Sequence, residues 1–213
     1  MRPEVVVIGA GGHAKVCIEL LRASSIPVAF CVGGDDSGES CLGVPVLKGD
    51  HHLGHLRGEG YALAFVAIGS NALRQRLGAS VRALGYRLVN AISPRAIISP
   101  SARLGEGVAV MAGAVINADS TIADLAIINT SASVDHDCRI GEAAHIAPQC
   151  GLAGNVSVGA RAFLGIGSRV IPDISVGEDV VAGAGSVIIS HITSGMRVAG
   201  VPAKKLNERT NTQ

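Results

Sequence analysis

The sequence is poor in aromatic residues, with no tryptophan, two tyrosines and three phenylalanines among 213 residues. Hydrophobic residues nevertheless make up 48% of the chain, so the core must be built from small aliphatic side chains. Such a core favours tightly stacked strands over a helical bundle. Charges are also sparse and balanced, with 18 Lys and Arg against 17 Asp and Glu. We therefore expect no basic surface that would collect nucleic acid or anionic membranes, and neither is predicted as a partner.

The chain also lacks paired cysteine motifs and long hydrophobic runs. Its cysteines are odd in number and show no C-x-x-C spacing, so we expect reduced thiols at Cys17, Cys31, Cys41, Cys138 and Cys150. The apolar run Val5–Ile8 near the amino terminus is too short for a signal sequence or a membrane span. These absences predict a cytoplasmic protein.

A six-residue period dominates the second half of the chain. Fifteen of sixteen positions in one series are Ile, Leu or Val: Ile98, Leu104, Val110, Ile116, Ile122, Ile128, Val134, Ile140, Ile146, Leu152, Val158, Leu164, Val170, Val176, Ala182 and Ile188. The residues two positions earlier are mostly small. This period fits neither an α-helix nor hairpins, and it is typical of a parallel β-helix with the aliphatic side chain inside and the small residue at the corner.

The length of the repeat predicts the size of this coil. Three-sided coils have about 18 residues per rung, which gives roughly five rungs spaced by about 4.8 Å. Glycines directly follow the aliphatic residue at 105, 141, 159, 165, 177 and 183. We expect the turns there to use the conformational freedom of glycine in φ.

Residues 1–92 follow a different pattern, in which apolar strands alternate with amphipathic helices. We expect strands at 5–8, 28–32, 64–68 and 87–89 and helices at 14–23 and 71–84. This alternation predicts a parallel α/β sheet. A boundary at Ser93–Pro94 divides the chain into an α/β domain of residues 1–92 and a β-helix of residues 93–213 with a carboxyl-terminal tail.

The first predicted strand leads into a glycine-rich turn. Gly9 to Ala14 can be read as G-x-G-x-x-A, and Asp35 follows at about the distance of a ribose-binding acid. A complete dinucleotide site needs two mononucleotide halves, so half a site fits these ninety residues better. It would hold a phosphate at the helix amino end, beside Asp35 or Asp36. The alternative is that the glycines only form a tight turn.

One cluster of ionisable residues stands out within the repeat. Asp135, His136 and Asp137 follow Val134 directly, and His145 lies nine residues further on. An imidazole can take a proton from an attacking amine or hydroxyl, and a neighbouring carboxylate can orient it. His136 is therefore the candidate base, with Asp137 as its orienting partner. A histidine that merely faces solvent in a turn is the competing interpretation.

Other histidines and cysteines suggest less chemistry. A zinc site of the β-helix type needs three histidines on neighbouring rungs, and His191 lies beyond the regular hexads, so no metal is predicted. The H-H-x-x-H run at His51, His52 and His55 lacks the glutamate of a metalloprotease helix and is interpreted as surface. The small-residue series also includes Cys138 and Cys150, which predicts packed corner thiols.

Several motifs together resemble one family. They are the glycine turn GAGGHAKV, the loop AIGSN, the unbroken hexads, the segments NTSASVDHDC and HIAPQCGLAGNVSVG, and the closing GVPAKKL. The chain is similar over almost its whole length to the left-handed β-helix sugar acetyltransferases of the bacillosamine, perosamine and sialic-acid pathways. Within that group it looks most like the N-acetyltransferases of nucleotide-linked 4-amino-4,6-dideoxy sugars, including perosamine N-acetyltransferase. The left-handed winding is implied by this resemblance.

The resemblance implies a role for each matching residue. His136 would be the general base, Asp137 would orient it, and the Gly154 N–H would bind the thioester carbonyl, while His145 matches a histidine near the acetyl group. Acetyl-CoA would lie between the β-helices of a homotrimer, with candidate contacts at Gly165, Ile166, Ala184, Gly200, Val201, Pro202, Ala203 and Lys204. The nucleotide sugar would occupy the amino-terminal crevice, with candidate contacts at Gly11, Gly12, His13, Asp35, Asp36 and Asn71.

The predicted function is therefore transfer of acetyl from acetyl-CoA to the 4-amino group of a UDP- or GDP-linked sugar, GDP-perosamine being an example. Three alternatives remain open at this point. An O-acetyltransferase acting on sialic acid would use the same base on a hydroxyl. A β-helix sugar-binding module would have no use for that base. A dinucleotide oxidoreductase would bind NAD.

Overall fold

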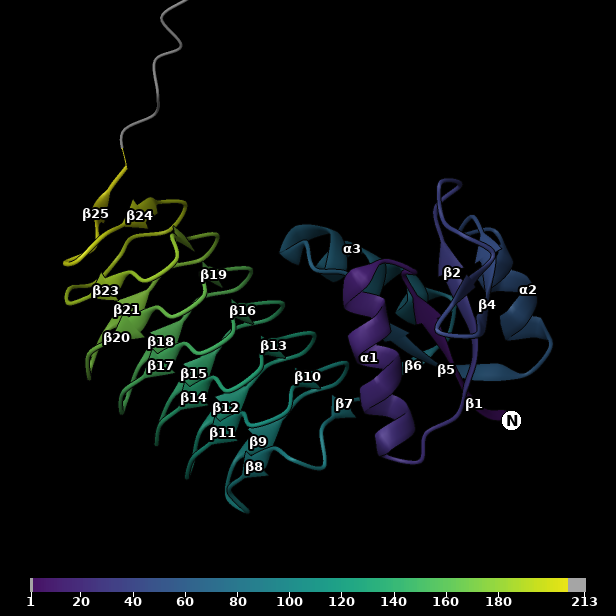
Figure 1. Cartoon of the computed structure of the whole chain (residues 1–213), viewed down its shortest axis with the longest axis horizontal. Coiled ribbons are helices and arrows are strands. Elements are labelled where there is room, and N and C mark those ends of the chain that lie inside the picture. The colour runs from purple at the N-terminus through teal and green to yellow at the C-terminus, as the bar shows by residue number, and fades with distance from the viewer. Residues whose placement is uncertain (1, 207–213) are drawn as a thin grey trace, which may run out of the picture.

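The computed structural model describes residues 2–206, which form a small α/β domain beside a long parallel β-helix (Figure 1). The predicted fold class, an α/β half-Rossmann domain followed by a left-handed parallel β-helix, is confirmed. No helix within residues 2–206 is long and apolar enough to cross a membrane.

The amino-terminal domain is a six-stranded sheet in the order β3-β4-β2-β1-β5-β6, with its pairs parallel except β3 with β4. Strand order reverses between β1 and β5, so the carboxyl ends of these strands open a crevice at the switch point. The elements are β1 (Arg2–Ile8), α1 (Gly12–Ala23), β2 (Val28–Gly33), β3 (Ser40–Cys41), β4 (Val44–Lys48), α2 (His52–Gly58), β5 (Tyr61–Val66), α3 (Asn71–Ala83) and β6 (Arg87–Leu88).

The structure adds three elements to this domain that sequence analysis did not predict, namely β3, β4 and α2. They lie in a stretch rich in glycine and polar residues, where apolar periodicity is weak. Helix α2 begins within the histidine run, and its buried residues are only Leu53 and Leu56. Short elements of this kind are stabilised by packing on the sheet, which local pattern does not reveal.

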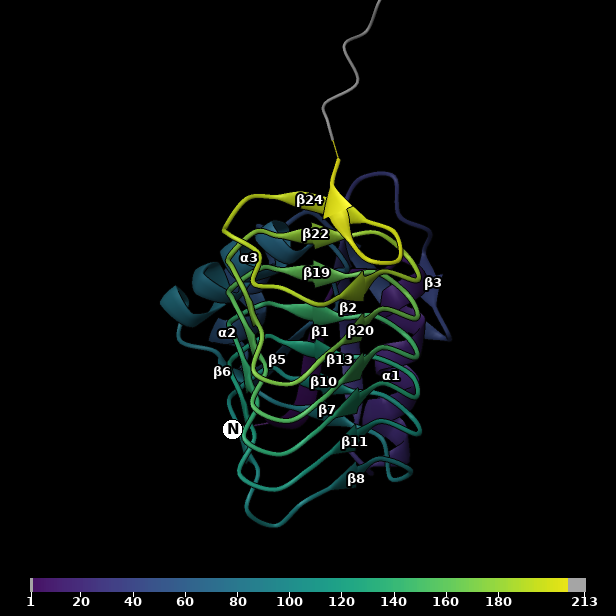
Figure 2. The same ribbon diagram turned by 90° about the vertical axis from the view of Figure 1, so that its left-hand side faces the viewer.

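The β-helix is three-sided, as the period predicts, and Figure 2 shows its stacked rungs. Strands one rung apart pair eighteen residues apart, as Ile127 does with His145. We call the three sheets face 1, face 2 and face 3. Face 1 contains β7 (Ala91–Ile92), β10 (Ala109–Val110), β13 (Ile127–Ile128), β16 (His145–Ile146), β19 (Phe163–Leu164), β22 (Val181–Ala182), β24 (Arg197–Ala199) and β25 (Lys204–Lys205).

The other two faces contain only two-residue strands. Face 2 contains β8 (Ile97–Ile98), β11 (Val115–Ile116), β14 (Ser133–Val134), β17 (Gly151–Leu152), β20 (Arg169–Val170) and β23 (Val187–Ile188). Face 3 contains β9 (Arg103–Leu104), β12 (Thr121–Ile122), β15 (Arg139–Ile140), β18 (Ser157–Val158) and β21 (Ser175–Val176). The predicted division at residue 92 stays a prediction, and β7 already pairs with β10 just before it.

The corners correct one expectation about glycine. Positive φ recurs every six residues, three positions after the inward aliphatic residue, at sites such as Leu125, Asp137 and Asn155. The glycines that directly follow the aliphatic residue do not have positive φ. Instead, a Cβ on Gly141 would lie 2.6 Å from the backbone nitrogen of Ala160 on the next rung. These glycines allow close approach of successive rungs, so the prediction that they supply φ freedom was wrong.

The two parts of the molecule share their cores. Small and aliphatic residues of face 1, including Ala109 and Ile127, pack in one cluster with Ala14 and Cys17 of α1. On the other side of the sheet, Leu125 packs with Val81 of α3 and other residues of the domain. The amino-terminal domain is thus fixed against face 1 through two apolar contacts, one on each side of its sheet.

Helix α3 matches the spacing of the rungs that it contacts. From its start to its end, Asn71 contacts Arg161, Gln75 contacts Glu142, and Arg82 contacts Asp124 and Glu106. Its contacts therefore descend from rung to rung along the length of the helix. The helix pitch is about 5.4 Å and strands in a sheet are about 4.8 Å apart, which allows this correspondence.

Candidate active site

His136 lies in the turn between face 2 and face 3, at the corner that follows β14. Its Nδ1 lies 2.8 Å from Oδ2 of Asp137, and both side chains are more than half exposed. A carboxylate can only accept, so Nδ1 carries the proton and Nε2 of the neutral ring is left as an acceptor. The positive φ of Asp137 brings its carboxylate beside the preceding ring. The expected pairing of His136 with Asp137 is present in the structure.

The rung below supports this turn. Oδ1 of Asp135 accepts hydrogen bonds from the His136 N–H at 2.8 Å and from Nδ2 of Asn117 at 2.9 Å. The hydroxyl of Ser120 donates to the Asp135 carbonyl at 2.5 Å and accepts from the Cys138 N–H. The backbone around His136 is therefore fixed from both sides.

The acidic neighbours of His136 change its proton affinity. The hydrogen bond with Asp137, followed by the charge of Asp135, raises the pKa of His136 above its ordinary value. A raised pKa makes the neutral ring a stronger base. It also means that a smaller fraction of the ring is neutral at low pH. The arrangement can accept a proton at Nε2 from a group that approaches the corner from solvent.

Gly154 lies directly against the imidazole, one rung further along. A Cβ at this position would be 2.6 Å from Cε1 and 2.7 Å from Nε2 of His136. Any larger residue would therefore displace the ring. Within residues 2–206 no hydrogen bond is formed by the Gly154 N–H, so this donor is free for an oxygen near Nε2.

His145 lies on face 1, in β16, in surroundings unlike those of His136. Its Nε2 is 2.9 Å from Nδ2 of Asn129, whose Oδ1 accepts the Thr130 N–H at 2.8 Å. The amide nitrogen of Asn129 therefore points at His145 and must donate, so Nε2 is unprotonated and Nδ1 carries the proton. Phe163 packs edge-on against the ring at 5.2 Å between centroids.

The Nδ1 proton of His145 has no partner within the described residues, although the atom is buried. Burial, followed by the charges of Arg74 and His13, lowers the pKa of His145 to about 3. The ring is therefore neutral at physiological pH. It offers a fixed N–H donor and cannot serve as the residue that cycles protons.

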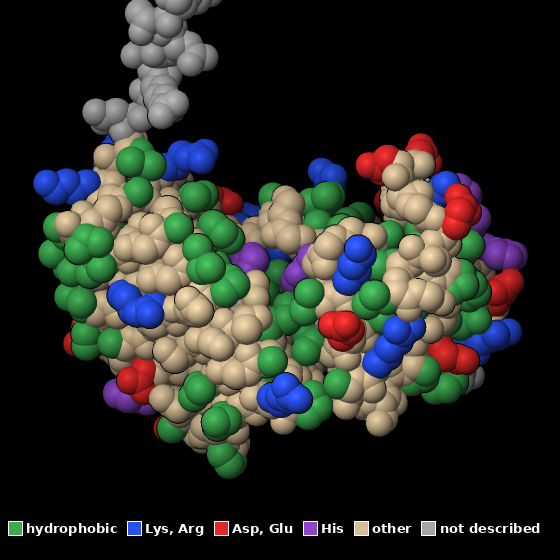
Figure 3. Space-filling model, viewed as in Figure 1, with side chains coloured by type: hydrophobic (Ala, Val, Ile, Leu, Met, Phe, Trp, Pro, Cys, Tyr) green, Lys and Arg blue, Asp and Glu red, His purple; other side chains and the backbone are tan. Residues whose placement is uncertain are grey.

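His13 lies at the start of α1, where the amino-terminal domain meets face 1, and histidine side chains are visible at this junction (Figure 3). Burial, followed by the charge of Arg74, lowers the pKa of His13 to about 4. Its Nε2 is 3.5 Å from Sγ of Cys17, whose own pKa is raised by burial to about 12. Two neutral histidines thus share this junction.

A pocket lies at the carboxyl ends of β1, β2 and β5, where sequence analysis predicts the nucleotide crevice. Its volume is about 410 Å³, and its lining includes Gly11 and Asp36 among the predicted residues. Gly12, His13, Asp35 and Asn71 do not line it. A Cβ at Gly11 or Gly12 would meet nothing within 4 Å, so space is open before the amino end of α1.

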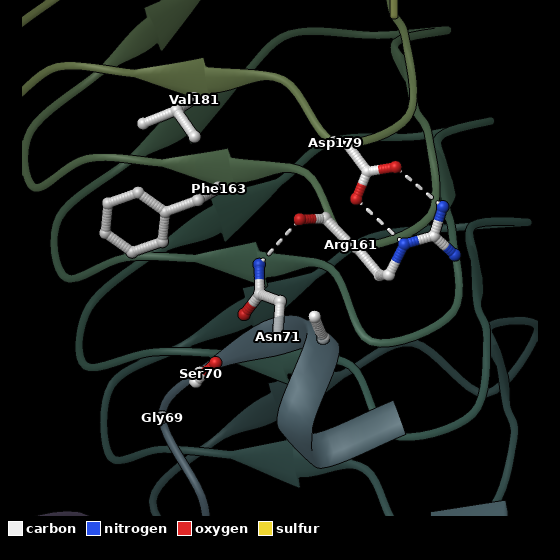
Figure 4. A pocket seen from close by; sticks show the side chains of 8 residues that line it. Gly69, Ser70, Asn71, Arg161, Phe163, Asp179 and Val181 are labelled. Atoms are coloured by element: carbon white, nitrogen blue, oxygen red, sulfur yellow. Dashed lines mark hydrogen bonds and ion pairs between the residues drawn. The ribbon is translucent and has the colours of Figure 1, made fainter. Parts of the chain in front are cut away.

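Asn71 has a different setting from the other predicted crevice residues. Its Nδ2 donates to the carbonyls of Arg161 at 2.8 Å and Ala162 at 3.1 Å, so the side chain joins α3 to the β-helix (Figure 4). A second pocket of about 310 Å³ opens beside it, lined by the β5–α3 loop, Phe163 and Val181. Arg161 borders this pocket and forms two hydrogen bonds with Asp179.

The residues expected to contact acetyl-CoA fall into two groups. Exposed residues lie at the corner between faces 1 and 2 and in the segment after it, and they comprise Ile166, Ala184, Gly200, Val201, Pro202 and Lys204. The other two are less exposed: Gly165 is buried against the backbone of Ala182 and Ala184 on the next rung, and Ala203 is half-buried. The exposed group forms one stripe, and His136 lies at a different corner of the same chain.

The remaining histidines and cysteines form no metal centre within residues 2–206, where no three His, Cys, Asp or Glu residues gather. All five cysteines are buried and unpaired, and Cys138 and Cys150 occupy corners as expected. His51 and His52 stack at the start of α2. Residues 4–81 match the PglD N-terminal domain.

Comparison with solved structures identifies the whole chain. It is 56% identical to PerB from Caulobacter crescentus, determined in complex with CoA and GDP-perosamine, with 96% of this chain and 97% of that one aligned at a TM-score of 0.93. The chain belongs to the left-handed β-helix sugar acetyltransferases. Histidine-to-asparagine and histidine-to-alanine mutants of the Caulobacter perosamine N-acetyltransferase have also been solved with the same two ligands.

Other similar proteins are more distant. The acetyltransferase domain of PglB from Neisseria gonorrhoeae, in complex with acetyl coenzyme A, is 41% identical, with 97% of this chain and 100% of that one aligned at a TM-score of 0.90. UDP-N-acetylbacillosamine N-acetyltransferase of Bacillus subtilis is 37% identical over 113 residues, which is 51% of each chain. An uncharacterized mimivirus protein is 30% identical over 120 residues. The chain therefore spans about a quarter to a half of the length of these curated relatives.

Sequence analysis missed two polar residues at the junction. Asn129, which fixes the tautomer of His145, stands within the NTSASVDHDC segment but was not singled out. Arg74 lies on the buried side of α3 with Gly78 and Val81, at helical spacings of four and three residues. A charged residue in an otherwise buried stripe is the signal that could have found it.

Proposed function

We propose that this acetyltransferase moves the acetyl group of acetyl-CoA to the 4-amino group of a nucleotide-linked 4-amino-4,6-dideoxy sugar. The observation that carries the proposal is the corner formed by His136, Asp137 and Gly154. It holds a base with a free Nε2 and a free backbone donor side by side. GDP-perosamine is the favoured acceptor because the most similar relative described above, at 56% identity, was determined with it.

In the proposed reaction the free amine of the sugar attacks the thioester carbonyl carbon directly. His136 Nε2 takes the proton from the amine nitrogen, and Asp137 stabilises the imidazolium that forms. The Gly154 N–H binds the carbonyl oxygen as it gains negative charge. As the carbon–sulfur bond breaks, the leaving thiolate takes up the proton. No covalent enzyme intermediate is needed, because both substrates are held together.

His145 completes the donor side of the proposal. Its neutral ring presents an Nδ1–H without a partner among the described residues, which suits a carbonyl oxygen of the acetyl donor. CoA is proposed to follow the exposed stripe that includes Ile166, Ala184 and Val201. Gly165 would support this stripe from within, since it is buried.

The amino-terminal domain, residues 1–92, is proposed to bind the nucleotide sugar, while residues 93–213 perform the transfer. Gly11 and Asp36 line the crevice and are the favoured nucleotide contacts, with Gly12 and Asp35 beside them. His13 and Asn71 lie at the junction, where the sugar would point toward the β-helix. The unpaired thiols fit a reducing compartment, and we propose the cytoplasm.

A homotrimer is proposed because one chain does not bring the site together. His136 lies at the corner between faces 2 and 3, whereas His145 lies on face 1 and the CoA stripe at the corner between faces 1 and 2. A neighbouring copy that sets its His136 corner against this face 1 would unite base, donor and acceptor. Threefold rotation repeats the same contact and closes the assembly.

The test is a thiol-release assay with acetyl-CoA and a panel of acceptors: GDP-perosamine, a UDP-linked 4-amino-4,6-dideoxy sugar, free sialic acid and no acceptor. We expect release with GDP-perosamine, reduced about 10²- to 10⁴-fold in His136→Asn. His191→Asn is the matched control. It removes a histidine that lies beyond the regular hexads, away from the proposed site, and it should keep full activity. Release with sialic acid alone, or full activity in His136→Asn, would overturn the proposal.

A further inference from the structure

Arg74 is a fully buried guanidinium whose hydrogen bonding is complete. It is 1% exposed, and it is the largest side chain among those fully buried in the described part of the chain. Nε donates to the Leu125 carbonyl at 2.8 Å, and Nη1 donates to the carbonyls of Ile68 at 2.9 Å and Gly69 at 3.1 Å. Nη2 donates to Oδ1 of Asn71 at 2.9 Å and to the Ala143 carbonyl at 2.7 Å. All five N–H groups are thus used.

These five acceptors belong to two parts of the molecule. Three belong to the loop between β5 and α3 and to the first residue of α3, and two are corner residues on consecutive rungs of the β-helix. Leu125 and Ala143 both have positive φ, which turns their carbonyls toward the helix side of the corner. Arg74 orients the side chain of Asn71, which in turn donates to the carbonyl of Arg161 on the next rung. Arg74 therefore ties the loop to the β-helix from inside the junction.

The charge of Arg74 is not neutralised by any carboxylate within residues 2–206, since its partners are carbonyl and amide oxygens. Burial lowers the pKa of Arg74 only to about 10, so it stays charged. A buried charge of this kind needs a full set of hydrogen bonds and usually a counter-ion. The absent counter-ion means that the positive potential extends to neighbouring groups.

This potential lowers the pKa of His13 and of His145. The hydrogen bond from Asn129 requires an unprotonated Nε2 in His145, independently of any titration argument. Cys17 and Arg74 are the other ionisable groups beside His13, and Arg74 and His13 are those beside His145. Phe163 and Asn129 carry no charge. Arg74 is thus the permanent charge that, after burial, lowers the pKa of both rings.

We propose that Arg74 is a positioning residue that fixes the β5–α3 loop on the β-helix and keeps His13 and His145 as neutral imidazoles at the junction. Geometry and charge are separate parts of this role. The hydrogen bonds set where the loop and Asn71 lie. The charge disfavours imidazolium on either side of it. The consequence for catalysis rests on the acetyl transfer proposed above, whereas the effect on the two rings does not.

Two substitutions separate these parts. Arg74→Lys keeps the charge and loses most of the hydrogen bonds, and Arg74→Met removes both. Histidine ring titrations by NMR, without substrates, are the primary measurement. In the unsubstituted protein and in Arg74→Lys, we expect His13 and His145 to stay neutral down to pH 5. In Arg74→Met we expect both rings to titrate about one pH unit or more higher than in the unsubstituted protein.

A matched control is Arg82→Gln, on the same helix. Arg82 is paired with Asp124 and Glu106 at the same corner of the β-helix, so this change removes an ion pair and leaves the two rings alone. Hydrogen exchange of residues 68–72 reports the geometric part. It should speed up in both Arg74 variants and not in Arg82→Gln.

Several results would overturn the proposal. One is a ring of His13 or His145 that titrates near pH 6.5 in the unsubstituted protein. Another is unchanged titration in a folded Arg74→Met, and a third is titration in Arg74→Lys that has moved as far as in Arg74→Met. If Arg74→Met does not fold, unchanged exchange at residues 68–72 in Arg74→Lys overturns the geometric part, while its ring titrations still test the charge.

The kinetic measurement separates this inference from the proposed function. Arg74→Lys should raise KM for the sugar with a loss of roughly 10- to 100-fold in kcat/KM, while its pH profile keeps the shape of the unsubstituted enzyme. An absence of transfer in every protein with every acceptor would reject the proposed function and leave the ring titrations to decide the role of Arg74.

Discussion

His136 and His145 of the β-helix occupy opposite environments. His136 is exposed at a corner, bound to a carboxylate, and its pKa is raised. His145 is largely enclosed on face 1, bound to an amide and facing a buried guanidinium, and its pKa is lowered to about 3. In the proposed reaction the two rings therefore have different roles: His136 is a base that gains and loses a proton, and His145 is a donor that stays neutral at physiological pH.

The first way to test this contrast is to disturb the corner alone. In Gly154→Ala the new Cβ would lie 2.6 Å from Cε1 of His136, so the ring must move. A displacement of about 1 Å should lower kcat/KM by about 100-fold. The measurement is steady-state kinetics, together with thermal unfolding to show that the fold is kept.

A matched control for Gly154→Ala is Gly54→Ala in α2. A Cβ at Gly54 would meet nothing within 4 Å, so activity and stability should be unchanged or slightly improved. Full activity in Gly154→Ala would mean that the position of the His136 ring in this corner is not required for transfer.

The β-helix could be predicted from the sequence because the residues that form each rung follow one another along the chain. The inward aliphatic series from Ile98 to Ile188 repeats without a slip, and from Val110 onward each of its members is buried. The His136–Asp137 pair could be found because it is contiguous in the chain. Asn129 and His145 could not be paired from the sequence, since their contact depends on a separation of sixteen residues within the coil.

A smaller effect is expected from weakening the partner of His136. Asp137→Asn keeps a residue that tolerates the positive φ of this position and removes the carboxylate. The hydrogen bond with Asp137 is the main cause of the raised pKa, so the pKa of His136 should fall. We expect kcat/KM to drop about tenfold at neutral pH and its acid limb to move to lower pH.

The pH dependence of kcat/KM measures both parts of this prediction. In the unsubstituted enzyme the acid limb should lie above pH 6.5, because a raised pKa keeps His136 charged to higher pH. The same acid limb in both proteins would show that another group controls it. Asp119→Asn, at the equivalent corner position one rung below, is the control that should change neither the rate nor the profile.

A third experiment gives His145 a carboxylate partner like that of His136. In Asn129→Asp the Oδ1 contact to the Thr130 N–H is kept, while a carboxylate oxygen replaces the donor that faces Nε2. The ring must then place a proton on Nε2, so the pKa of His145 should rise by about one pH unit or more. Ring titration by NMR checks this. Asn117→Asp, beside Asp135 on face 2, should leave His145 unchanged.

The amino-terminal domain was less predictable than the β-helix for a physical reason. Its crevice depends on where β1, β2 and β5 end relative to one another, and the glycine turn specifies only one of these ends. Gly11 of the run GAGGHAKV lines the crevice, whereas His13 lies at the junction beside Cys17 and Asn71 bonds to Arg161. The positions of side chains at a contact between two domains depend on the surface of the partner domain. The local sequence of either domain alone does not reveal that surface.

The last effect concerns stability and distinguishes the two histidine environments without substrates. His13 and His145 have pKa values of about 4 and about 3 in the folded protein, below the ordinary 6.5. Neutral rings therefore stabilise the fold above pH 6.5, and this contribution is lost as the pH falls toward 4 and 3. The loss is at most about 1.4 kcal/mol per pH unit for each ring.

Thermal unfolding between pH 7 and pH 5 tests this loss, because that window lies above the usual range of carboxylates. Tm should fall across it in the unsubstituted protein. His136→Asn should show the same fall or a slightly steeper one, since a charged His136 beside Asp137 favours the folded state at low pH. If Tm were constant between pH 7 and pH 5, the junction could not be the neutral environment described here, and the contrast between the two histidines would reduce to exposure alone.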